Sequence, residues 1–212
     1  CWDKDSLKVR WEMTGATVGN GDGFVTDSAF NVGVTHVKYY ITDPDNNEAT
    51  CEFDVTILDV TPPEITANCG DVADDADPNS CWQVPATLQD PVFRDDCWDV
   101  DSLTVRWEMT GATVGSGYGF VTDSSFHVGV THVTYYVSDP DNNEANCSFD
   151  VTIHDVTLPE ITANCFDVTD NADPNSCWRT PVTLHDPQYE DNCWDTDSLT
   201  VRWEMTGATV GS

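Results

Sequence analysis

The chain has 212 residues and carries 38 Asp and Glu against 8 Lys and Arg, which gives a formal net charge of −30 at pH 7. Such a charge repels phosphate backbones and anionic membrane surfaces, so the composition argues against nucleic acid as a partner. Its apolar runs fall short of the roughly 18 to 20 residues that a membrane span requires, so we expect no membrane insertion.

The nine cysteines recur at a fixed spacing of 96 residues. Cys51 recurs as Cys147, Cys69 as Cys165, Cys81 as Cys177, and Cys1 as Cys97 and Cys193. This period is too long for a solenoid unit and matches a small independent domain. Repeated cysteines among many polar residues favour an oxidising compartment, so we expect a secreted protein, extracellular or at the cell surface. With neither an initiator Met nor a signal-peptide pattern, the sequence reads as a mature product or an excerpt.

Alternation of apolar and polar residues predicts the β-strands of the complete repeat. In chain order they cover residues 64–69, 83–88, 103–110, 132–137 and 147–155. Pro85 must lie at an edge or a bulge, because proline donates no ladder hydrogen bond. The last three segments show the period of two that is typical of half-buried strands. Their expected inward residues are Leu103, Val105, Trp107, Met109, Val133, Tyr135, Val137, Cys147, Phe149, Val151 and Ile153.

The predicted fold is all-β. No segment shows a convincing helical period, and turn-rich segments separate the strands at 74–80 (DDADPNS), 115–119 (GSGYG) and 139–143 (DPDNN). Short strands spaced in this way predict tandem antiparallel β-sandwich domains with immunoglobulin-like connections. Trp107 is expected to anchor the core of the sandwich.

A spaced motif then recurs in two copies. In the second copy it consists of Gly129, Thr131, Val133, Tyr135, Asp139, Cys147, Phe149, Val151 and Asp155; in the first copy, of Gly33, Thr35, Val37, Tyr39, Asp43, Cys51, Phe53, Val55 and Asp59. With the other cysteines in register, the motif resembles the hyalin repeat (HYR) family. One departure is Asn46-Asn47 in place of the family's Gly-Asn. The resemblance implies immunoglobulin-like repeats of extracellular adhesive or matrix proteins, without a catalytic site.

The joints between repeats are predicted to be short and stiff. DVTPPE (59–64) and DVTLPE (155–160) connect the last strand of one repeat to the first strand of the next. Proline fixes its own φ angle and restricts its predecessor, so such a joint cannot swing freely. The division is then a partial repeat with strands C to G (1–60), a complete repeat (61–156) and a partial repeat with strands A to C (157–212).

Four cysteines in each repeat allow three pairings, and the spacing alone does not distinguish them. The predicted order of the strands does. Cys69 and Cys81 flank one acidic turn at one pole of the sandwich and are expected to pair. Cys97 and Cys147 lie at the opposite pole and are expected to pair. Repetition then adds Cys1–Cys51 and Cys165–Cys177 and leaves Cys193 unpaired by truncation. A zinc site is disfavoured, since the spacing contains no Cys-x-x-Cys pair.

Acidic loops next to the predicted Cys97–Cys147 bridge are the candidate metal ligands. They contain Asp95, Asp96, Asp99 and Asp101 beside Cys97, and Asp139, Asp141 and Asn143 in a D-x-D-x-N array. Hard oxygen ligands that converge at a domain pole suit calcium. The alternative is that these residues are solvated turn residues, because Glu144 stands where an EF-hand loop needs Gly.

Three further features complete the sequence-based interpretation. Trp98, with its copies Trp2 and Trp194, is expected to pack over a disulfide, a periodic sticky surface being the alternative. Asn146-Cys147-Ser148 is an acceptor triplet for N-glycosylation.

His36 and His132 form one repeated site in the turn before a strand. Because no nucleophile lies with a base in a definable constellation, we expect a non-enzyme.

The near-identity of successive repeats favours a structural role, since a polymer can use many copies whereas one recognition site needs a single copy. We therefore expect a structural segment of an extracellular filament or adhesin stalk. Its expected partners are copies of itself along a fibre, either in one longer covalent array or by strand exchange, and glycans are a further candidate. The alternative function is a carbohydrate-binding or cell-adhesion recognition module.

Overall fold

The computed structural model describes residues 6–181 and 183–207. Contacts between residues divide the chain into two compact units that interleave in sequence. The first unit comprises 1–67, 91–106 and 135–147, and the second comprises 68–90, 107–134 and 148–212. Helical segments include two short 3-10 turns, η2 (Val100–Ser102) and η3 (Thr196–Ser198). Across the described part of the chain, no helix has the length and apolar character that crossing a membrane requires.

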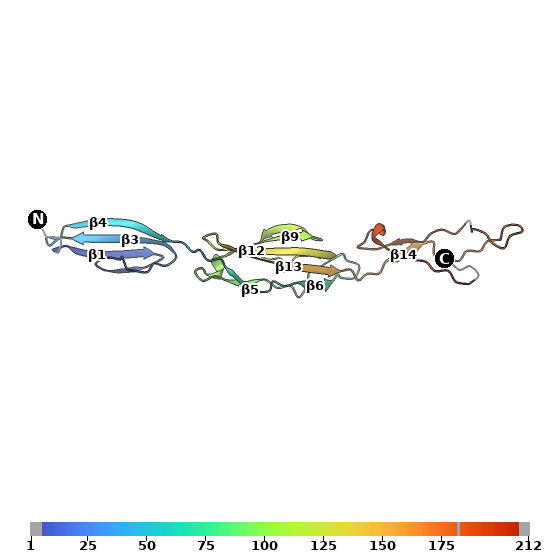
Figure 1. Ribbon diagram of the computed structural model, residues 1–212, viewed down its shortest axis with the longest axis horizontal. Coiled ribbons are helices and arrows are strands. Elements are labelled where there is room, and N and C mark those ends of the chain that lie inside the picture. Colours follow the sequence, from blue (N-terminus) through green and yellow to red (C-terminus); the bar gives the residue numbers. More distant parts are fainter. Residues whose placement is uncertain (1–5, 182, 208–212) are drawn as a thin grey trace. The chain divides into compact units, whose positions relative to one another are not determined.

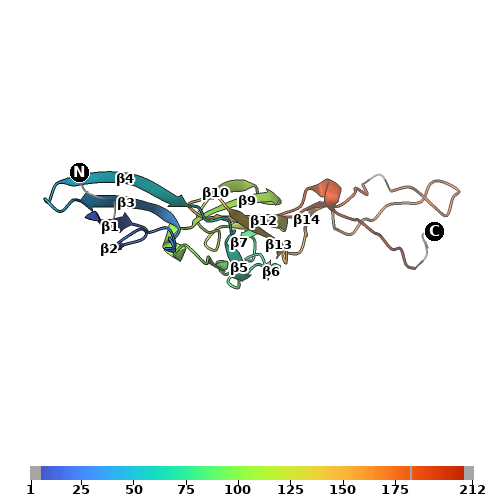
Figure 2. The same cartoon turned by 60° about the vertical axis from the view of Figure 1, so that its left-hand side comes forward.

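The first unit contains a four-stranded antiparallel sheet of order β2-β1-β3-β4 (Figures 1 and 2). Its strands are β1 (Lys8–Gly15), β2 (Gly19–Asp22), β3 (Gly33–Thr42) and β4 (Glu48–Ile57). Alternation along β1 and β3 turns Met13 and Val37 toward one side, where they meet Val25 in a small core. Trp11 and Tyr39 pack against this core.

A five-stranded sheet has the order β10-β9-β12-β13-β6. Its strands are β6 (Val72–Asp75), β9 (Thr104–Gly111), β10 (Gly115–Tyr118), β12 (Gly129–Ser138) and β13 (Glu144–His154). Strands β9, β12 and β13 confirm the three predicted strands with alternating residues. Val133, Val151 and Ile153 are fully or almost fully buried, as their place in the alternation predicts. Strand β6 pairs with β13 in parallel. The sequence predicted antiparallel pairing, and this one pair departs from it.

Three two-stranded sheets complete the architecture: β5 (Glu64–Ala67) with β8 (Val92–Arg94), β7 (Trp82–Gln83) with β11 (Phe126–His127), and β14 (Glu160–Ala163) with β15 (Gln188–Glu190). Strand β5 confirms the start of the segment predicted at 64–69. The strand predicted at 83–88 is wrong beyond Gln83. Pro85 has no N–H to donate, and its carbonyl accepts a turn hydrogen bond from Leu88 N at 3.2 Å.

The glycine-rich segment at 115–119, predicted as a turn, forms strand β10 instead. Its glycines let the Trp107 ring lie directly on the strand: a Cβ atom added at Gly117 would lie 2.8 Å from Trp107 Cζ2. Trp107, which the sequence predicted as an anchor of the core, is therefore half-buried on a glycine surface.

The same strand position is buried differently in the two copies. Phe53 on β4 is 43% exposed, whereas Phe149 on β13 is 5% exposed. Residues 68–90 supply Ala76 and Leu88 to the buried residues of the second unit. The two copies therefore differ in the burial of this position although their strand sequences are similar.

Asparagine replaces glycine in the turn that departs from the family pattern. Asn46 and Asn142 have φ angles of 65° and 69°, a left-handed conformation that Asn tolerates better than most residues. In the first copy, Asp43 Oδ1 accepts a hydrogen bond from Asn47 N at 2.8 Å and Oδ2 accepts one from Asn47 Nδ2 at 2.9 Å. These bonds stabilise the charged carboxylate and lower the pKa of Asp43 below its ordinary value.

The repeated histidines lie within strands β3 and β12, and not in the turn where they were predicted. His36 Nδ1 lies 2.7 Å from Asp54 Oδ1, and this hydrogen bond, with the negative charges of Asp54 and Glu52, raises the pKa of His36. His132 contacts Asp150 through the equivalent atoms. Both pairs are solvent-exposed links between neighbouring strands.

Candidate functional site at the joints between repeats

Both joints begin with the same local turn. In the first joint, Thr61 N donates a hydrogen bond to Asp59 Oδ1 at 2.9 Å. In the second, Thr157 N donates to Asp155 Oδ1, also at 2.9 Å. A short polar side chain that accepts from the backbone two residues later fixes a turn. The D-V-T sequence therefore gives each joint a defined shape.

The first joint is held by the turn that follows strand β12. Asp59 N donates to Asp141 Oδ2 at 2.9 Å, and Asn143 Nδ2 donates to Asp59 O at 3.0 Å. Asn143 Nδ2 also donates to Asp139 Oδ2 at 2.7 Å, and Asn143 N donates to Asp139 Oδ1 at 2.8 Å. Three residues of the predicted D-x-D-x-N array thus lie at the joint, where they hold its backbone.

Carboxylates from three segments of the chain meet at this joint. Oxygen atoms of Asp59, Asp95 and Asp139 lie within 4.8 Å of one another. Asp95 is oriented by two backbone donors, Cys97 N at 2.9 Å and Trp98 N at 3.0 Å, which both reach its Oδ1 atom. The predicted ligands Asp95 and Asp139 are therefore brought together.

The remaining predicted ligands divide into two groups. Asp96 belongs to a second cluster with Asp59 and Cys97. Asp99 and Asp101 flank or lie in η2 and join no such cluster within the described part of the chain. Asp59 was not predicted as a ligand, although its recurrence as Asp155 at the start of the second joint was a visible signal.

The bridge that was expected to join the acidic loops is absent, so the Cys97–Cys147 prediction is wrong. Cys97 has a free thiol, whereas Cys147 is disulfide-bonded. Cys97 lies beside Asp59 and Asp96 at the joint, while Cys147 is part of strand β13. Partial desolvation and then the charges of Asp59, Asp96 and Asp95 raise the pKa of the Cys97 thiol, which stays protonated and weakly nucleophilic at neutral pH.

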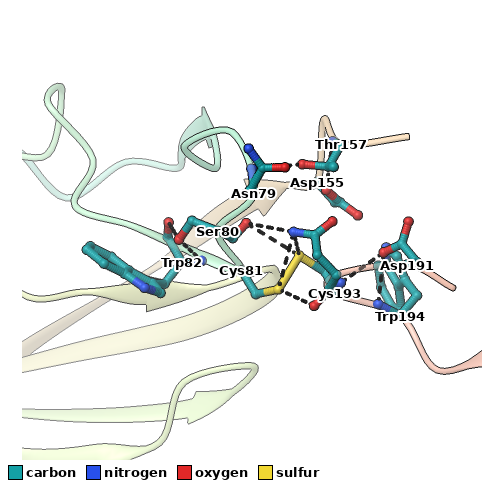
Figure 3. The surroundings of a disulfide bond; sticks show 10 residues. Asn79, Ser80, Cys81, Trp82, Asp155, Thr157, Asp191, Cys193 and Trp194 are labelled. Atoms are coloured by element: carbon teal, nitrogen blue, oxygen red, sulfur yellow. Dashed lines mark hydrogen bonds between the residues drawn. A yellow bond between two sulfur atoms is a disulfide. The ribbon is translucent and has the colours of Figure 1, made fainter. Parts of the chain in front are cut away.

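A disulfide bond ties the chain together across the second joint. Cys81 is bonded to Cys193, 112 residues later, with the two Cα atoms 5.2 Å apart (Figure 3). Asn192 Nδ2 donates to Ser80 O at 3.5 Å beside the bridge. Asn79 N donates to Thr157 Oγ1 in the joint itself at 3.2 Å. Residues 79–81 therefore attach covalently and by hydrogen bonds to the segment that follows the second joint.

This bridge overturns two predictions, the Cys69–Cys81 pair and an unpaired Cys193. The segment between Cys69 and Cys81 is not one turn, because it contains strand β6. Four residues at about 3.3 Å per residue carry the chain along the sheet. Ala76 N then donates to His154 O at 2.8 Å, so the chain arrives next to the second joint. Cys69 is itself disulfide-bonded.

The two pairs predicted by repetition are also wrong. Cys51, Cys165 and Cys177 have free, exposed thiols, so neither Cys1–Cys51 nor Cys165–Cys177 forms; Cys1 lies outside the described residues. Of residues 164–187, those that the structure describes form no strand that could hold Cys165 and Cys177 together.

The tryptophans next to the cysteines differ in their surroundings. Trp98 is half-buried, but it follows a free cysteine, so the predicted packing over a Cys97 disulfide is not formed. Trp194 follows the bonded Cys193 and is 47% exposed. Trp2 lies outside the described residues. Asn146 is exposed on β13, and its glycosylation stays a prediction.

Comparison with known proteins assigns the repeats. A family model described as the HYR domain matches residues 2–57 and 58–153, which make up more than half of the chain. The chain belongs to the HYR domain family. The resemblance inferred from the spaced motif is therefore confirmed, as is the all-β fold of tandem repeats.

Curated relatives include two hyalins. The chain is 36% identical over 141 residues to hyalin of Strongylocentrotus purpuratus, which covers 64% of this chain and 10% of that protein. It is 33% identical over 143 residues to hyalin of Lytechinus variegatus, and this match covers 64% of this chain and 23% of that protein. The chain is also 25% identical over 160 residues to a Mus musculus protein, sushi, von Willebrand factor type A, EGF and pentraxin domain-containing protein 1. This match covers 71% of this chain and 4% of that protein. The chain thus spans less than a quarter of the length of these relatives.

Solved structures give a looser likeness. The protocadherin gammaB7 EC3-6 cis-dimer structure has a TM-score of 0.32 and 13% sequence identity, covering 76% of this chain and 44% of that chain. The structure of protocadherin gamma B2 extracellular cadherin domains 1-5 has a TM-score of 0.30 and 12% sequence identity, and the match covers 74% of this chain and 34% of that chain. Scores this low carry no argument about function.

Proposed function

We propose that this HYR chain is a structural, non-enzymatic segment of an extracellular filament or adhesin stalk, in which the joints between repeats transmit tension. The observation that carries the proposal is the Cys81–Cys193 bridge, which fastens the second repeat to the segment beyond its joint. Membership of a family of tandem repeats supports it, and so do the short proline-containing joints.

The mechanical consequence follows from the length of the bridged loop. A force applied to the two ends of the chain enters and leaves this loop at Cys81 and Cys193, whose Cα atoms are 5.2 Å apart. The residues between them are shielded, because a covalent bond carries the load past them. Copies of the chain, or further repeats, are the proposed partners along the fibre.

Single-molecule pulling tests this role. The chain is held by residues 1 and 212 and stretched with and without reductant. Reduction opens the Cys81–Cys193 bridge together with the disulfide bonds of Cys69 and Cys147. The 112 residues between Cys81 and Cys193 alone add about 400 Å of extended length at about 3.6 Å per residue. A Cys165→Ser variant, which lacks only a free thiol, is the control and keeps the wild-type difference. Equal extended lengths with and without reductant would contradict the proposal.

The second candidate function is a carbohydrate-binding or cell-adhesion recognition module. It is favoured by exposed aromatic side chains, of which Trp178 and Trp203 are 72% and 68% exposed. Such rings can stack on sugars or pack on a partner. Saturable glycan-array binding that Trp178→Ala or Trp203→Ala abolishes, without a change in pulling behaviour, would favour this role over the load-bearing one.

A further inference from the structure

The acidic cluster of the first joint contains two carboxylate oxygens that nothing in the described chain satisfies. Asp59 Oδ2 and Asp95 Oδ2 are buried and accept no hydrogen bond. Asp59 is only 6% exposed and Asp139 only 5%. Native proteins rarely leave buried polar atoms without a partner, and each such atom calls for an explanation, an ion among them.

The electrostatics of the cluster sharpen this point. Three carboxylates lie within 4.8 Å of one another and two of them are buried, where an uncompensated negative charge is destabilising. Arg94, the nearby cation, pairs instead with Glu64 at 2.6 Å. No Lys or Arg among the described residues makes an ion pair with Asp59, Asp95 or Asp139. A positive charge is therefore missing from the middle of the cluster.

We propose that Asp59, Asp95 and Asp139 bind a divalent cation, calcium above all, at the joint. Carboxylate oxygens are the ligands that calcium prefers, at about 2.3 to 2.6 Å from the ion. Oxygen atoms of all three residues lie within 4.8 Å of one another, close enough for one ion to contact each of them at such distances. The thiol of Cys97 is a soft ligand and takes no part.

The three ligands come from different parts of the chain, so the ion acts as a clamp. Asp59 belongs to the joint, Asp95 to the loop after β8, and Asp139 to the turn between β12 and β13. The ion would thus fasten the joint to two loops of the second repeat. At the second joint, Asp155 and Asp191 occupy the repeat positions of Asp59 and Asp95, and their oxygens also lie within 4.8 Å of each other.

This clamp goes beyond the load-bearing role and stands without it, because it concerns binding of an ion by a single chain. Asparagine substitutions can test it with little change in shape. Asp59→Asn and Asp95→Asn each keep an Oδ1 atom that accepts the existing backbone hydrogen bonds. They replace only the two unsatisfied oxygens. Asp99→Asn is the matched control, since Asp99 carries a similar charge four residues from Asp95 and makes no side-chain cap hydrogen bond.

The experiment measures calcium binding by isothermal titration calorimetry, and thermal unfolding with calcium or with chelator. We expect calcium to raise the Tm of the wild-type chain. Asp59→Asn and Asp95→Asn should weaken binding at the first joint at least tenfold, while Asp99→Asn leaves it unchanged. In chelator the Asn variants should melt no lower than the wild type, because they remove repulsion between buried charges.

Each other outcome contradicts the site. A wild-type Tm that does not respond to calcium overturns the proposal directly and needs no variant. If Asp99→Asn weakened calcium binding as much as Asp59→Asn does, calcium would be screening the net charge of the chain and would not occupy a defined site. Asn variants that melt lower than the wild type in chelator would mean that the oxygens serve the fold without a cation.

Discussion

Asn143 donates its side-chain amide to the main-chain oxygen of Asp59, 84 residues earlier in the sequence, at a distance of 3.0 Å. This hydrogen bond joins a β-turn to an interdomain segment. Its counterpart in the first copy, Asn47, makes the same bonds within its own turn and, among the residues that the structure describes, none to a joint. The pair of asparagines therefore isolates the contribution of the joint contact.

We predict that Asn143→Ala destabilises the chain more than Asn47→Ala. Both substitutions remove the bonds to the turn aspartate, but only Asn143→Ala also leaves the partly buried Asp59 oxygen unpaired. Leaving a buried acceptor unsatisfied costs about 1 to 3 kcal/mol. Urea unfolding followed by tryptophan fluorescence measures the difference. Equal destabilisation by the two variants would mean that the joint contact contributes nothing.

A second prediction concerns the glycine surface under Trp107. In Gly117→Ala the new Cβ atom would meet Trp107 Cζ2 at 2.8 Å, so the ring must move or the strand must shift. Overpacking of this kind costs about 1 to 3 kcal/mol. Gly70→Ala is the control, because no atom lies within 4 Å of its added Cβ. Thermal unfolding of the two variants should separate them clearly, and a neutral Gly117→Ala would refute this account of β10.

The strands were predictable because their signal is local. Val133, Val151 and Ile153 lie at every second position, and burial of one sheet face enforces that period. Strand β10 was not predictable from propensity, since its glycines disfavour a strand. These glycines are required because the Trp107 ring on the neighbouring strand lies directly on them. A requirement set by a residue elsewhere in the fold produces no pattern in the sequence of β10 itself.

The cysteine pairing was not predictable for a related reason. The prediction assumed that residues 70–80 form one turn, which would have kept Cys81 beside Cys69. Strand β6 is four residues long and has little apolar alternation, so its pairing with β13 decides where Cys81 lies. The acidic residues Asp95 and Asp139 were identified correctly, but their convergence with Asp59 depends on the fold of the joint.

A third prediction concerns pH. The hydrogen bond to Asp54 raises the pKa of His36 above its usual 6.5, and the negative charge of Glu52 adds to the effect while partial desolvation of the ring opposes it. A raised pKa in the folded state means that this pair stabilises the fold fully below about pH 6.5, and that the stabilisation disappears as the pH rises through the pKa of His36. NMR titration of the imidazole should give a pKa above 6.5, and Asp54→Asn should lower it. An identical pKa in Asp54→Asn would contradict this assignment.

Disulfide mapping tests whether neighbouring repeats are fastened across their joint. The oxidised chain, with free thiols blocked, is digested without reductant, and linked peptides are sequenced by mass spectrometry. The structure predicts a linked pair that contains Cys81 and Cys193, linked peptides that contain Cys69 and Cys147, and blocked thiols at Cys51, Cys97, Cys165 and Cys177. A linked pair that contains Cys69 and Cys81, with Cys193 blocked, would contradict the claim.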